Sequence, residues 1–201
     1  MNNFNKFMKR SFDIVSSLIG IIILSPILIV ISIIIKSTSE GPVLFKQRRV
    51  GKDKKIFEIF KFRTMVVNAE SLGTQITIGE DKRITSIGKF LRKYKLDELP
   101  QLFNVFLGQM SLVGPRPEVP KYVDMYTNEQ LEVLTVRPGI TDYASLKYSD
   151  ENDLLGKVSD PENYYINVIM QDKLKLNLAY IKNNNVFKDI KIIFQTILKC
   201  L

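Results

Sequence analysis

The longest apolar run in the chain covers residues 14–35 and contains no charged side chain. About 20 apolar residues in a helix match the ~30 Å hydrocarbon core of a bilayer, so this run is long enough to enter a membrane. Ser25 and Pro26 interrupt its middle. A proline inside a helix removes a backbone donor and clashes with the preceding turn. We therefore predict two half-helices within residues 1–36, with the Ser25 hydroxyl as one candidate partner for a freed carbonyl.

Basic residues flank this run on both sides, and cations beside a membrane segment tend to stay on the cytoplasmic side. A re-entrant hairpin, which dips into the bilayer and returns, satisfies that tendency at both ends. A kinked helix that spans the bilayer is the alternative. A cleaved signal peptide is disfavoured, because the run exceeds a typical h-region of about 7 to 15 residues and no small-x-small site ends it. The segment is therefore expected to stay in the mature protein.

Short apolar runs at residues 43–45 and 56–62 predict two strands, joined by a turn at residues 50–53. Helical spacing and capping signals predict helices over much of the chain after this hairpin. The expected helices are one from Ser86 to about Lys95, one over residues 96–106 that Gly108 ends, a short one after the capping box of Thr127 and Gln130, one from Asp160-Pro161 to about Ile181, and one over residues 186–201. The polar residues 145–160 predict a mobile loop.

The last helix is amphipathic and basic, so it is expected either to lie in the headgroup region or to pack on the core. With 201 residues, the chain has room for one domain behind the membrane segment. The predicted fold is a membrane-associated α+β protein. A re-entrant helix-break-helix over residues 1–36 precedes a small, mostly helical domain over residues 37–201, with a short β-hairpin and amphipathic interfacial helices.

Charge is distributed unevenly along the chain. Residues 1–100 hold 18 Lys+Arg against 9 Asp+Glu, a net +9, whereas residues 101–201 hold 11 against 12, a net −1. Basic residues next to the membrane segment favour anionic lipid headgroups or a phosphate-bearing substrate. A nucleic acid would use the same charges, so composition alone leaves that partner open.

The missing residue types restrict the chemistry. The chain has no His and a single cysteine, Cys200. It therefore has no imidazole base, no Cys/His zinc site and no internal disulfide, which fits a reducing cytosolic compartment. Carboxylates must supply any acid, base, nucleophile or metal ligand, and oxygen ligands favour a hard cation such as Mg²⁺.

Asp97 and Glu98 come directly before Leu99-Pro100, and a proline is tolerated only in the first turn of a helix. The two carboxylates are therefore expected at a helix N-terminus, where the positive end of the helix dipole lowers the pKa of an aspartate. A carboxylate held ionised can bind a metal or attack phosphorus. The alternative is that Asp97 only caps the helix.

Five cations are candidates for binding phosphate. Arg116 lies between two prolines in Gly114-Pro115-Arg116-Pro117, so its backbone loses little entropy when it orders. Arg137 precedes Pro138-Gly139 in a similar turn. Lys61 and Arg63 share one face of the second strand, and Arg92 belongs to a helix rich in lysine. Plain turns and solvated faces are the alternatives for each of these taken alone.

Six motifs follow one another in a specific order. They are the proline-broken apolar run, Phe45-Lys46-Gln47-Arg48-Arg49-Val50-Gly51, Lys61-Phe62-Arg63-Thr64-Met65, Leu96-Asp97-Glu98-Leu99-Pro100-Gln101-Leu102, Met110-Ser111-Leu112-Val113-Gly114-Pro115-Arg116-Pro117-Glu118 and Val136-Arg137-Pro138-Gly139-Ile140-Thr141. From Phe7 to about Leu198 this series closely resembles the bacterial sugar transferase family, the monotopic phosphoglycosyl transferases or polyprenyl-phosphate hexose-1-phosphate transferases. It looks like the minimal catalytic form, without the four-helix membrane domain of larger members.

The resemblance implies transfer of a sugar-1-phosphate from a UDP-sugar to polyprenyl (undecaprenyl) phosphate through a covalent aspartyl intermediate, with release of UMP. The location implied is the cytoplasmic face of the bacterial inner membrane, in contact with membrane lipid. Asp97 would be the nucleophile and a ligand of Mg²⁺, and Glu98 its partner in proton or metal handling. Lys61, Arg63, Arg92, Arg116 and Arg137 would surround the phosphates, and Ser25-Pro26 would be the re-entrant break.

Two stretches depart from the family's usual pattern. Asp142-Tyr143-Ala144-Ser145-Leu146 stands where many members have Gly-Trp-Ala-Gln-Val, and Leu176-Asn177-Leu178-Ala179-Tyr180 stands where a Leu-Asp-x-x-Tyr-Tyr run is expected. These departures leave the sugar of the donor open. A homo-oligomer is also left open by the sequence.

The rival interpretation is a membrane-tethered basic module that binds anionic lipid or nucleic acid. Such a module would need aromatic residues within the basic region, which Phe45, Phe57, Phe60 and Phe62 provide. It would have little need for paired carboxylates. The order of motifs favours the enzyme, for which no nucleic-acid partner is expected.

Overall fold

A computed structural model describes residues 3–69 and 81–200 of the protein. The elements in chain order are α1 (Asn3–Thr38), β1 (Leu44–Val50), η1 (Lys52–Lys54), β2 (Ile56–Phe62), α2 (Ser86–Lys93), η3 (Leu96–Glu98), α3 (Gln101–Phe106), β3 (Ser111–Val113), α4 (Pro120–Val123), η4 (Gln130–Thr135), β4 (Gly139–Thr141), α5 (Tyr143–Lys147), α6 (Glu151–Leu155), α7 (Pro161–Tyr164), η5 (Tyr165–Ile169), α8 (Met170–Lys182) and α9 (Val186–Cys200). The predicted class, a membrane-associated α+β fold rich in helix, is confirmed.

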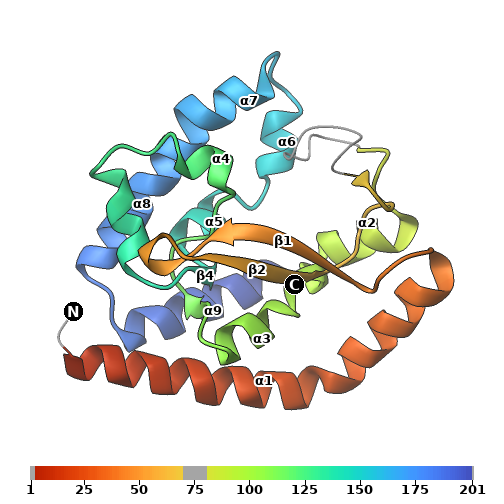
Figure 1. Ribbon diagram of the computed structural model, residues 1–201, viewed down its shortest axis with the longest axis horizontal. Helices are drawn as coiled ribbons and strands as arrows, with labels where there is room; N and C mark the ends of the chain where they lie inside the picture. The colour runs from red at the N-terminus through yellow and green to blue at the C-terminus, as the bar shows by residue number, and fades with distance from the viewer. Residues whose placement is uncertain (1–2, 70–80, 201) are drawn as a thin grey trace.

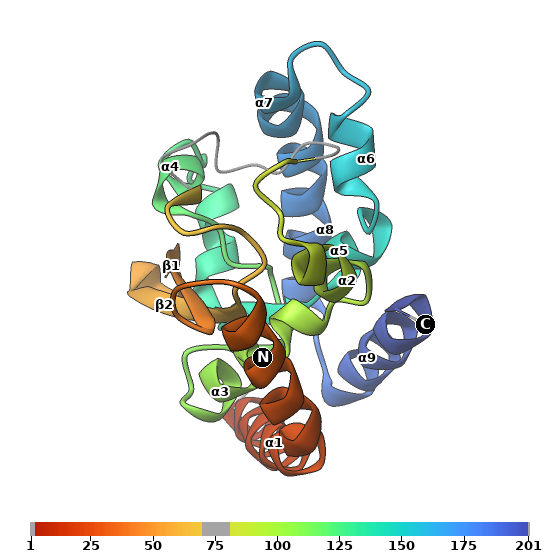
Figure 2. The same cartoon turned by 90° about the vertical axis from the view of Figure 1, so that its right-hand side faces the viewer.

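The long helix α1 lies along one end of the molecule, the β1–β2 hairpin crosses the middle, and α7 lies at the opposite end (Figures 1 and 2). β1 and β2 pair antiparallel from Leu44↔Phe62 to Val50↔Ile56, which confirms the predicted hairpin and lengthens its first strand. A short parallel pair, β3 with β4, was not predicted.

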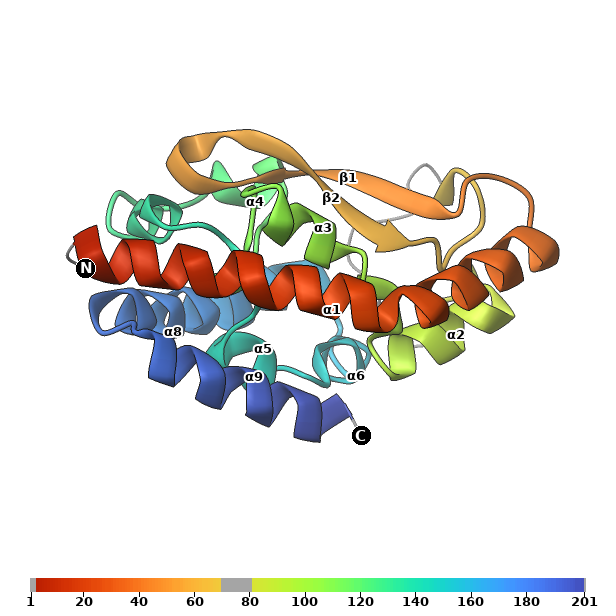
Figure 3. The same ribbon diagram turned by 90° about the horizontal axis from the view of Figure 1, so that it is seen from below.

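Helix α1 continues from Asn3 to Thr38 with Pro26 inside it, and it bends part of the way along (Figures 1 and 3). Pro26 has no N–H to give the carbonyl of Ile22, four residues earlier. The Ser25 hydroxyl donates to that carbonyl oxygen instead, at 2.8 Å, as predicted for this serine. The prediction of two separate half-helices is therefore corrected to one bent helix, because the freed acceptor is satisfied within it. A re-entrant path through the bilayer stays a prediction.

The N-terminal part of α1 is fixed to the domain by polar contacts. The buried carboxylate of Asp13 accepts from the Ser111 hydroxyl at 3.0 Å and from the Leu112 N–H at 3.1 Å. Lys9 forms an ion pair with Asp189 of α9, with Nζ and Oδ2 2.5 Å apart. Part of the basic flank therefore serves internal contacts rather than lipid headgroups.

The C-terminal half of α1 forms part of a hydrophobic core cluster. Ile31 and Ile35 are buried there with Phe62 of β2 and Leu91 of α2, and Leu96 packs against the same group. Most of α1 is nevertheless exposed: of its most apolar 18-residue window only 17% is buried. By length and composition the helix is sufficient to cross a membrane.

Exposed apolar side chains gather on α1, on α3 and the residue after it, and on α9. They include Phe4, Ile22, Ile23, Ile29 and Ile33 on the first, Phe103, Phe106 and Leu107 on the second, and Phe187, Phe194, Ile197 and Leu198 on the third. These three helices lie at one end of the molecule (Figures 2 and 3). We call this set the apolar base. Helix α9 packs on the core, one of its two predicted placements, because its Ile192 is fully buried in the domain. A position in the headgroup region stays a prediction.

Several boundaries were predicted correctly and others were not. The Thr127 N–H donates to Gln130 Oε1 and the Gln130 N–H to Thr127 Oγ1, which confirms the capping box. Asp160 caps α7 as predicted. Thr85, not Ser86, caps α2, because the Thr85 hydroxyl accepts from the Gly88 N–H. The expected loop at residues 145–160 contains the end of α5 and all of α6.

Candidate active site

The turn η3 carries the acidic pair between α2 and α3. Lys95, with φ at 55°, is in the left-handed region and redirects the chain after α2. Leu96–Glu98 then forms a single 3-10 turn, and Pro100 precedes α3 with helical dihedral angles. Asp97 and Glu98 therefore come before the regular helix rather than within its first turn.

Two cations hold the Glu98 carboxylate. Lys61 Nζ lies 2.9 Å from Glu98 Oε1, and the Arg116 guanidinium donates to both carboxylate oxygens, with Nη1 3.1 Å from Oε2. Burial alone would raise the pKa of Glu98, but Arg116 and Lys61 outweigh it and hold the pKa well below its ordinary value. Glu98 is therefore an anion at neutral pH and a poor proton donor.

Asp97 is 7% exposed and forms no hydrogen bond through its carboxylate to any other residue that the structure describes. Burial, and then the charge of Glu98, raise the pKa of Asp97, while Lys61, Arg92 and Lys95 partly offset both. The predicted lowering of this pKa is wrong, because the carboxylate is buried beside another anion and precedes the helix. A buried carboxylate with few hydrogen bonds is a stronger nucleophile than a solvated one, provided that it is ionised.

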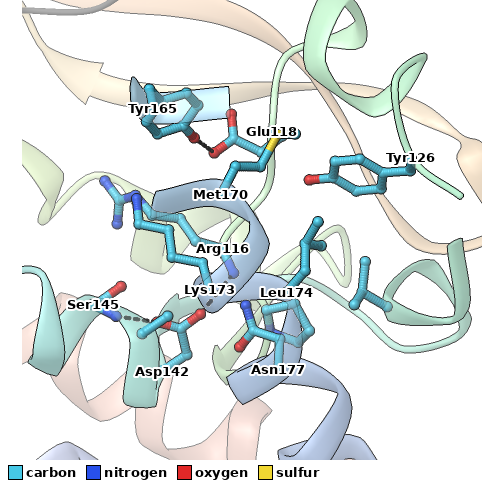
Figure 4. A pocket seen from close by; sticks show the side chains of 13 residues that line it. Arg116, Glu118, Tyr126, Asp142, Ser145, Tyr165, Met170, Lys173, Leu174 and Asn177 are labelled. Carbon is cyan, nitrogen blue, oxygen red and sulfur yellow. Dashed lines mark hydrogen bonds between the residues drawn. The ribbon is translucent and has the colours of Figure 1, made fainter. Parts of the chain in front are cut away.

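Arg116 is positioned through its backbone as well as its side chain. The Arg116 N–H donates to Asp142 Oδ2 at 3.1 Å, while Asp142 Oδ1 accepts from the Ser145 N–H at 2.6 Å (Figure 4). Asp142 is fully buried. The pairing with Glu98 raises the pKa of Arg116 despite its burial, so the guanidinium is permanently charged. Pro115, Pro117 and Asp142 together limit the positions that this cation can take.

Lys61 and Arg92 complete the charged cluster. Lys61 lies on β2, and burial lowers its pKa while Glu98 opposes that shift. Arg92 lies on α2, where its Nε donates to Thr64 Oγ1 at 2.8 Å. Burial also lowers the pKa of Arg92, and Asp97 is the largest opposing charge. β2, α2 and the loop after β3 thus bring three of the predicted cations to the acidic pair on η3.

The other two predicted cations contact different parts of the chain. Arg63 is buried and donates to the Ser39 carbonyl at 2.9 Å and to the Glu40 carbonyl, so it binds the end of α1. Arg137 Nε donates to the Gly108 carbonyl at 2.8 Å, beyond the C-terminal end of α3. The alternation of residues 61–63 placed Arg63 on the same strand face as Lys61, but it did not indicate that the Arg63 side chain binds backbone carbonyls.

Sequence reasoning missed a second polar group beside the first. Arg49 Nη1 donates to the Pro117 carbonyl at 3.0 Å and lies 3.5 Å from Glu118 Oε2, and the Tyr165 hydroxyl donates to Glu118 Oε1 at 2.5 Å. This group fixes the residues that follow Arg116. The glutamate directly after Gly-Pro-Arg-Pro was the available signal for it.

The Asp97 carboxylate suits a metal that needs few protein ligands. The described residues contain no group of three or more acidic, His or Cys side chains that could hold a metal ion. Glu98 is already occupied by two cations. Mg²⁺ commonly takes one or two carboxylates and completes its shell with water and substrate phosphates, so Asp97 alone fits it. The cluster as a whole can bind a multiply charged anion beside the ionised carboxylate of Asp97.

Comparisons with known proteins agree with this chemistry. Residues 4–201 match the profile of the family described as bacterial sugar transferase. A UDP-N-acetylgalactosamine-undecaprenyl-phosphate N-acetylgalactosaminephosphotransferase of Aeromonas hydrophila is 40% identical over 95% of the chain and 43% of its own length. A UDP-glucose:undecaprenyl-phosphate glucose-1-phosphate transferase of Klebsiella pneumoniae is 39% identical over 99% of the chain and 41% of its own length. The exopolysaccharide production protein PSS of Rhizobium leguminosarum is 36% identical over 94% of the chain and 93% of its own length. The chain thus spans about two fifths of the first two relatives.

Proposed function

The chain belongs to the bacterial sugar transferase family, and on that basis we propose that it transfers a sugar-1-phosphate from a UDP-sugar to undecaprenyl phosphate and releases UMP. The first two relatives named above are transferases to undecaprenyl phosphate by name, with N-acetylgalactosamine in one and glucose in the other. The observation that carries the proposal is the buried Asp97 carboxylate, without a hydrogen bond among the described residues, beside three cations. That combination suits attack on a phosphate ester.

In the first step an oxygen of Asp97 bonds to the β-phosphorus of the donor. The bond from that phosphorus to the oxygen bridging to the α-phosphorus breaks, and UMP leaves with the bridging oxygen and its electron pair. In the second step an oxygen of undecaprenyl phosphate bonds to the same phosphorus, and the bond to Asp97 breaks. The carboxylate is then restored, so two displacements replace one.

The cations neutralise the negative charge that the reaction gathers. Arg116 and Lys61 are held by Glu98 and present fixed positive charge without reorganisation. Glu98 acts as their anchor, since its low pKa makes it unsuited to proton transfer. Arg92 lies near enough to Asp97 to favour its ionised form. Asp97 would hold Mg²⁺ together with diphosphate oxygens, and the bound cation would reduce repulsion between the carboxylate and the diphosphate.

The proposal is tested by UMP release from the protein held in nanodiscs with undecaprenyl phosphate and a panel of UDP-sugars. We expect turnover with at least one donor and transfer of its radiolabelled sugar phosphate to lipid. Without the acceptor, we expect one stoichiometric burst of UMP, because Asp97 can be loaded only once. Absence of UMP with every donor would contradict the transferase proposal, and its rival, a lipid-binding module, predicts that result.

The membrane topology that we propose places both ends of α1 on the cytoplasmic side. The bent helix and its apolar base suit a shallow insertion, at the level where the acceptor's phosphate lies. Cysteines at Asn2 and Thr38, in a Cys200→Ser background, leave the flanking charges unchanged. Both are expected to resist a membrane-impermeant thiol reagent added to intact cells. Labelling must appear after the cells are opened.

Replacing Ser25-Pro26 with Ala-Leu supplies the matched comparison. The change returns an amide donor to the Ile22 carbonyl and removes a residue that costs about 3 kcal/mol inside a helix. The straightened helix should then favour the spanning form, in which the contacts of Lys9 and Asp13 with the domain break and residue 2 labels from outside. Outside labelling of residue 2 with Pro26 in place would show that α1 spans the bilayer.

A further inference from the structure

A small cavity lies between the Arg116 loop and helix α8 (Figure 4). Its volume of about 30 Å³ gives room for roughly two water molecules, or for a substituent of a few non-hydrogen atoms. Apolar side chains of Val133, Met170 and Leu174 form part of its wall. The reaction proposed above assigns no role to this space.

Two residues that line the cavity each carry a buried polar atom without a hydrogen-bond partner among the described residues: Oδ1 of Asn177 and Oγ of Ser145. Asn177 is 5% exposed. A buried polar atom without a partner costs about 1 to 3 kcal/mol, so these atoms indicate a missing ligand or water. Both residues belong to the two stretches that depart from the family's usual motifs.

The charged groups at the cavity already have partners. Arg116 pairs with Glu98, Lys173 with Glu151, Glu118 with Tyr165 and Arg49, and Asp142 with the N–H groups of Arg116 and Ser145. A charged ligand would have to displace one of these pairs. A neutral group that can both donate and accept a hydrogen bond suits the two unpartnered atoms.

Arg116 connects the cavity to the chemistry. Arg116 lines the cavity, and its guanidinium contacts the carboxylate of Glu98, next to Asp97. An arginine side chain extends about 6 to 7 Å, roughly the span from a sugar phosphate to a substituent at sugar carbon 2. A donor bound with its β-phosphorus at Asp97 would therefore bring part of its sugar to this cavity.

We propose that the cavity receives the acetamido group of an N-acetylated UDP-sugar, an inference that rests on the transferase function proposed above. The amide N–H would donate to Asn177 Oδ1, and the Ser145 hydroxyl would donate to the acetamido carbonyl. The methyl group would contact the apolar wall. A hydroxyl at the same sugar carbon would reach less deeply and leave at least one of the two atoms without a partner.

The test compares two matched pairs of donors: UDP-N-acetylglucosamine with UDP-glucose, and UDP-N-acetylgalactosamine with UDP-galactose. The measurement is kcat/KM for UMP release in the wild type, Asn177→Leu and Ser145→Ala. In at least one pair the wild type should prefer the N-acetylated donor. Asn177→Leu should reduce that preference about tenfold and Ser145→Ala somewhat less, because each loses one hydrogen bond. Activity toward the plain hexose donor should be largely retained.

Asn167→Leu is the control, since Asn167 is an exposed asparagine of η5 outside the cavity. Thermal unfolding of each variant separates selectivity from misfolding, and Ser145→Ala, the smaller change, keeps the comparison valid if Asn177→Leu fails to fold. The acetamido site would be overturned if the wild type preferred plain hexose donors, or if both variants kept the wild-type ratio of kcat/KM between the paired donors. The cavity would then hold only water. No UMP from any donor would instead contradict the transferase function itself.

Discussion

Asp97→Asn is expected to abolish turnover, with UMP release falling by several powers of ten. An amide is neither a useful nucleophile nor an anionic metal ligand, and the side chain keeps its size, so the packing of η3 should survive. UMP release with undecaprenyl phosphate measures the loss. Mass spectrometry of the wild type incubated with donor alone should find the phosphosugar on Asp97, and the variant should lack it.

Asp124→Asn is the matched control, because Asp124 is an exposed carboxylate at the end of α4. It should behave as the wild type. If Asp97→Asn kept more than about a tenth of the wild-type rate, Asp97 would not be the nucleophile.

The pH profile provides a second measure of the same carboxylate. Because burial and Glu98 raise the pKa of Asp97 above its ordinary 3.8, kcat/KM should begin to fall at a higher pH than an ordinary aspartate would give. Arg92→Gln removes a cation that favours the anion, so it should raise this pKa further and move the acidic limb to higher pH. An unchanged limb would mean that another group controls it.

Arg116→Ala is expected to cause the second largest loss. The variant leaves Glu98 buried with Lys61 as its remaining cation partner, and breaking a buried ion pair by removing one member costs about 3 to 5 kcal/mol. Activity should fall at least a hundredfold, with kcat lower and KM for the donor higher. Arg116→Lys should restore charge but not the two-pronged contact with Glu98, so its rescue should be partial.

A double variant distinguishes anchoring from independent action. If Glu98 acts by holding Arg116, Arg116→Ala combined with Glu98→Gln should be little worse than the more damaged single variant. Arg48→Ala, at an exposed arginine of β1, should retain wild-type kinetics. Additive losses in the double variant would show that Glu98 and Arg116 act separately.

Local signals predicted the elements that local interactions determine. The apolar run over β2, the capping box at Thr127 and the Asp160-Pro161 start each depend on residues within a few positions, and each was confirmed. The order of motifs was sufficient to predict that Lys61, Arg92 and Arg116 lie close to Asp97 and Glu98. That prediction came from the resemblance of the whole motif series to one family, not from any of these residues taken alone.

Tertiary contacts decided the rest. The pKa of Asp97 rises because neighbours distant in sequence bury it, which no property of the helix start reveals. Arg63 reaches carbonyls that α1 brings to it, over 20 residues away in the chain. Asp142 supports Arg116 across 26 residues, so neither position indicates the other in the sequence. The sequence pattern predicted Ser25 as a partner for a freed carbonyl, but it did not indicate that this hydrogen bond would keep α1 continuous.

The packing of α1 has a consequence for acceptor choice. Ile31 and Ile35 share a core cluster with Leu91, and Leu96, next to Asp97, packs on that cluster. The exposed apolar helix and the turn that carries Asp97 thus pack on the same core cluster. If α1 inserts as proposed, this packing would set the height of the Asp97 carboxylate above the bilayer. In the proposed reaction an acceptor would then be selected partly by the depth at which its own phosphate rests, before any contact with its chain.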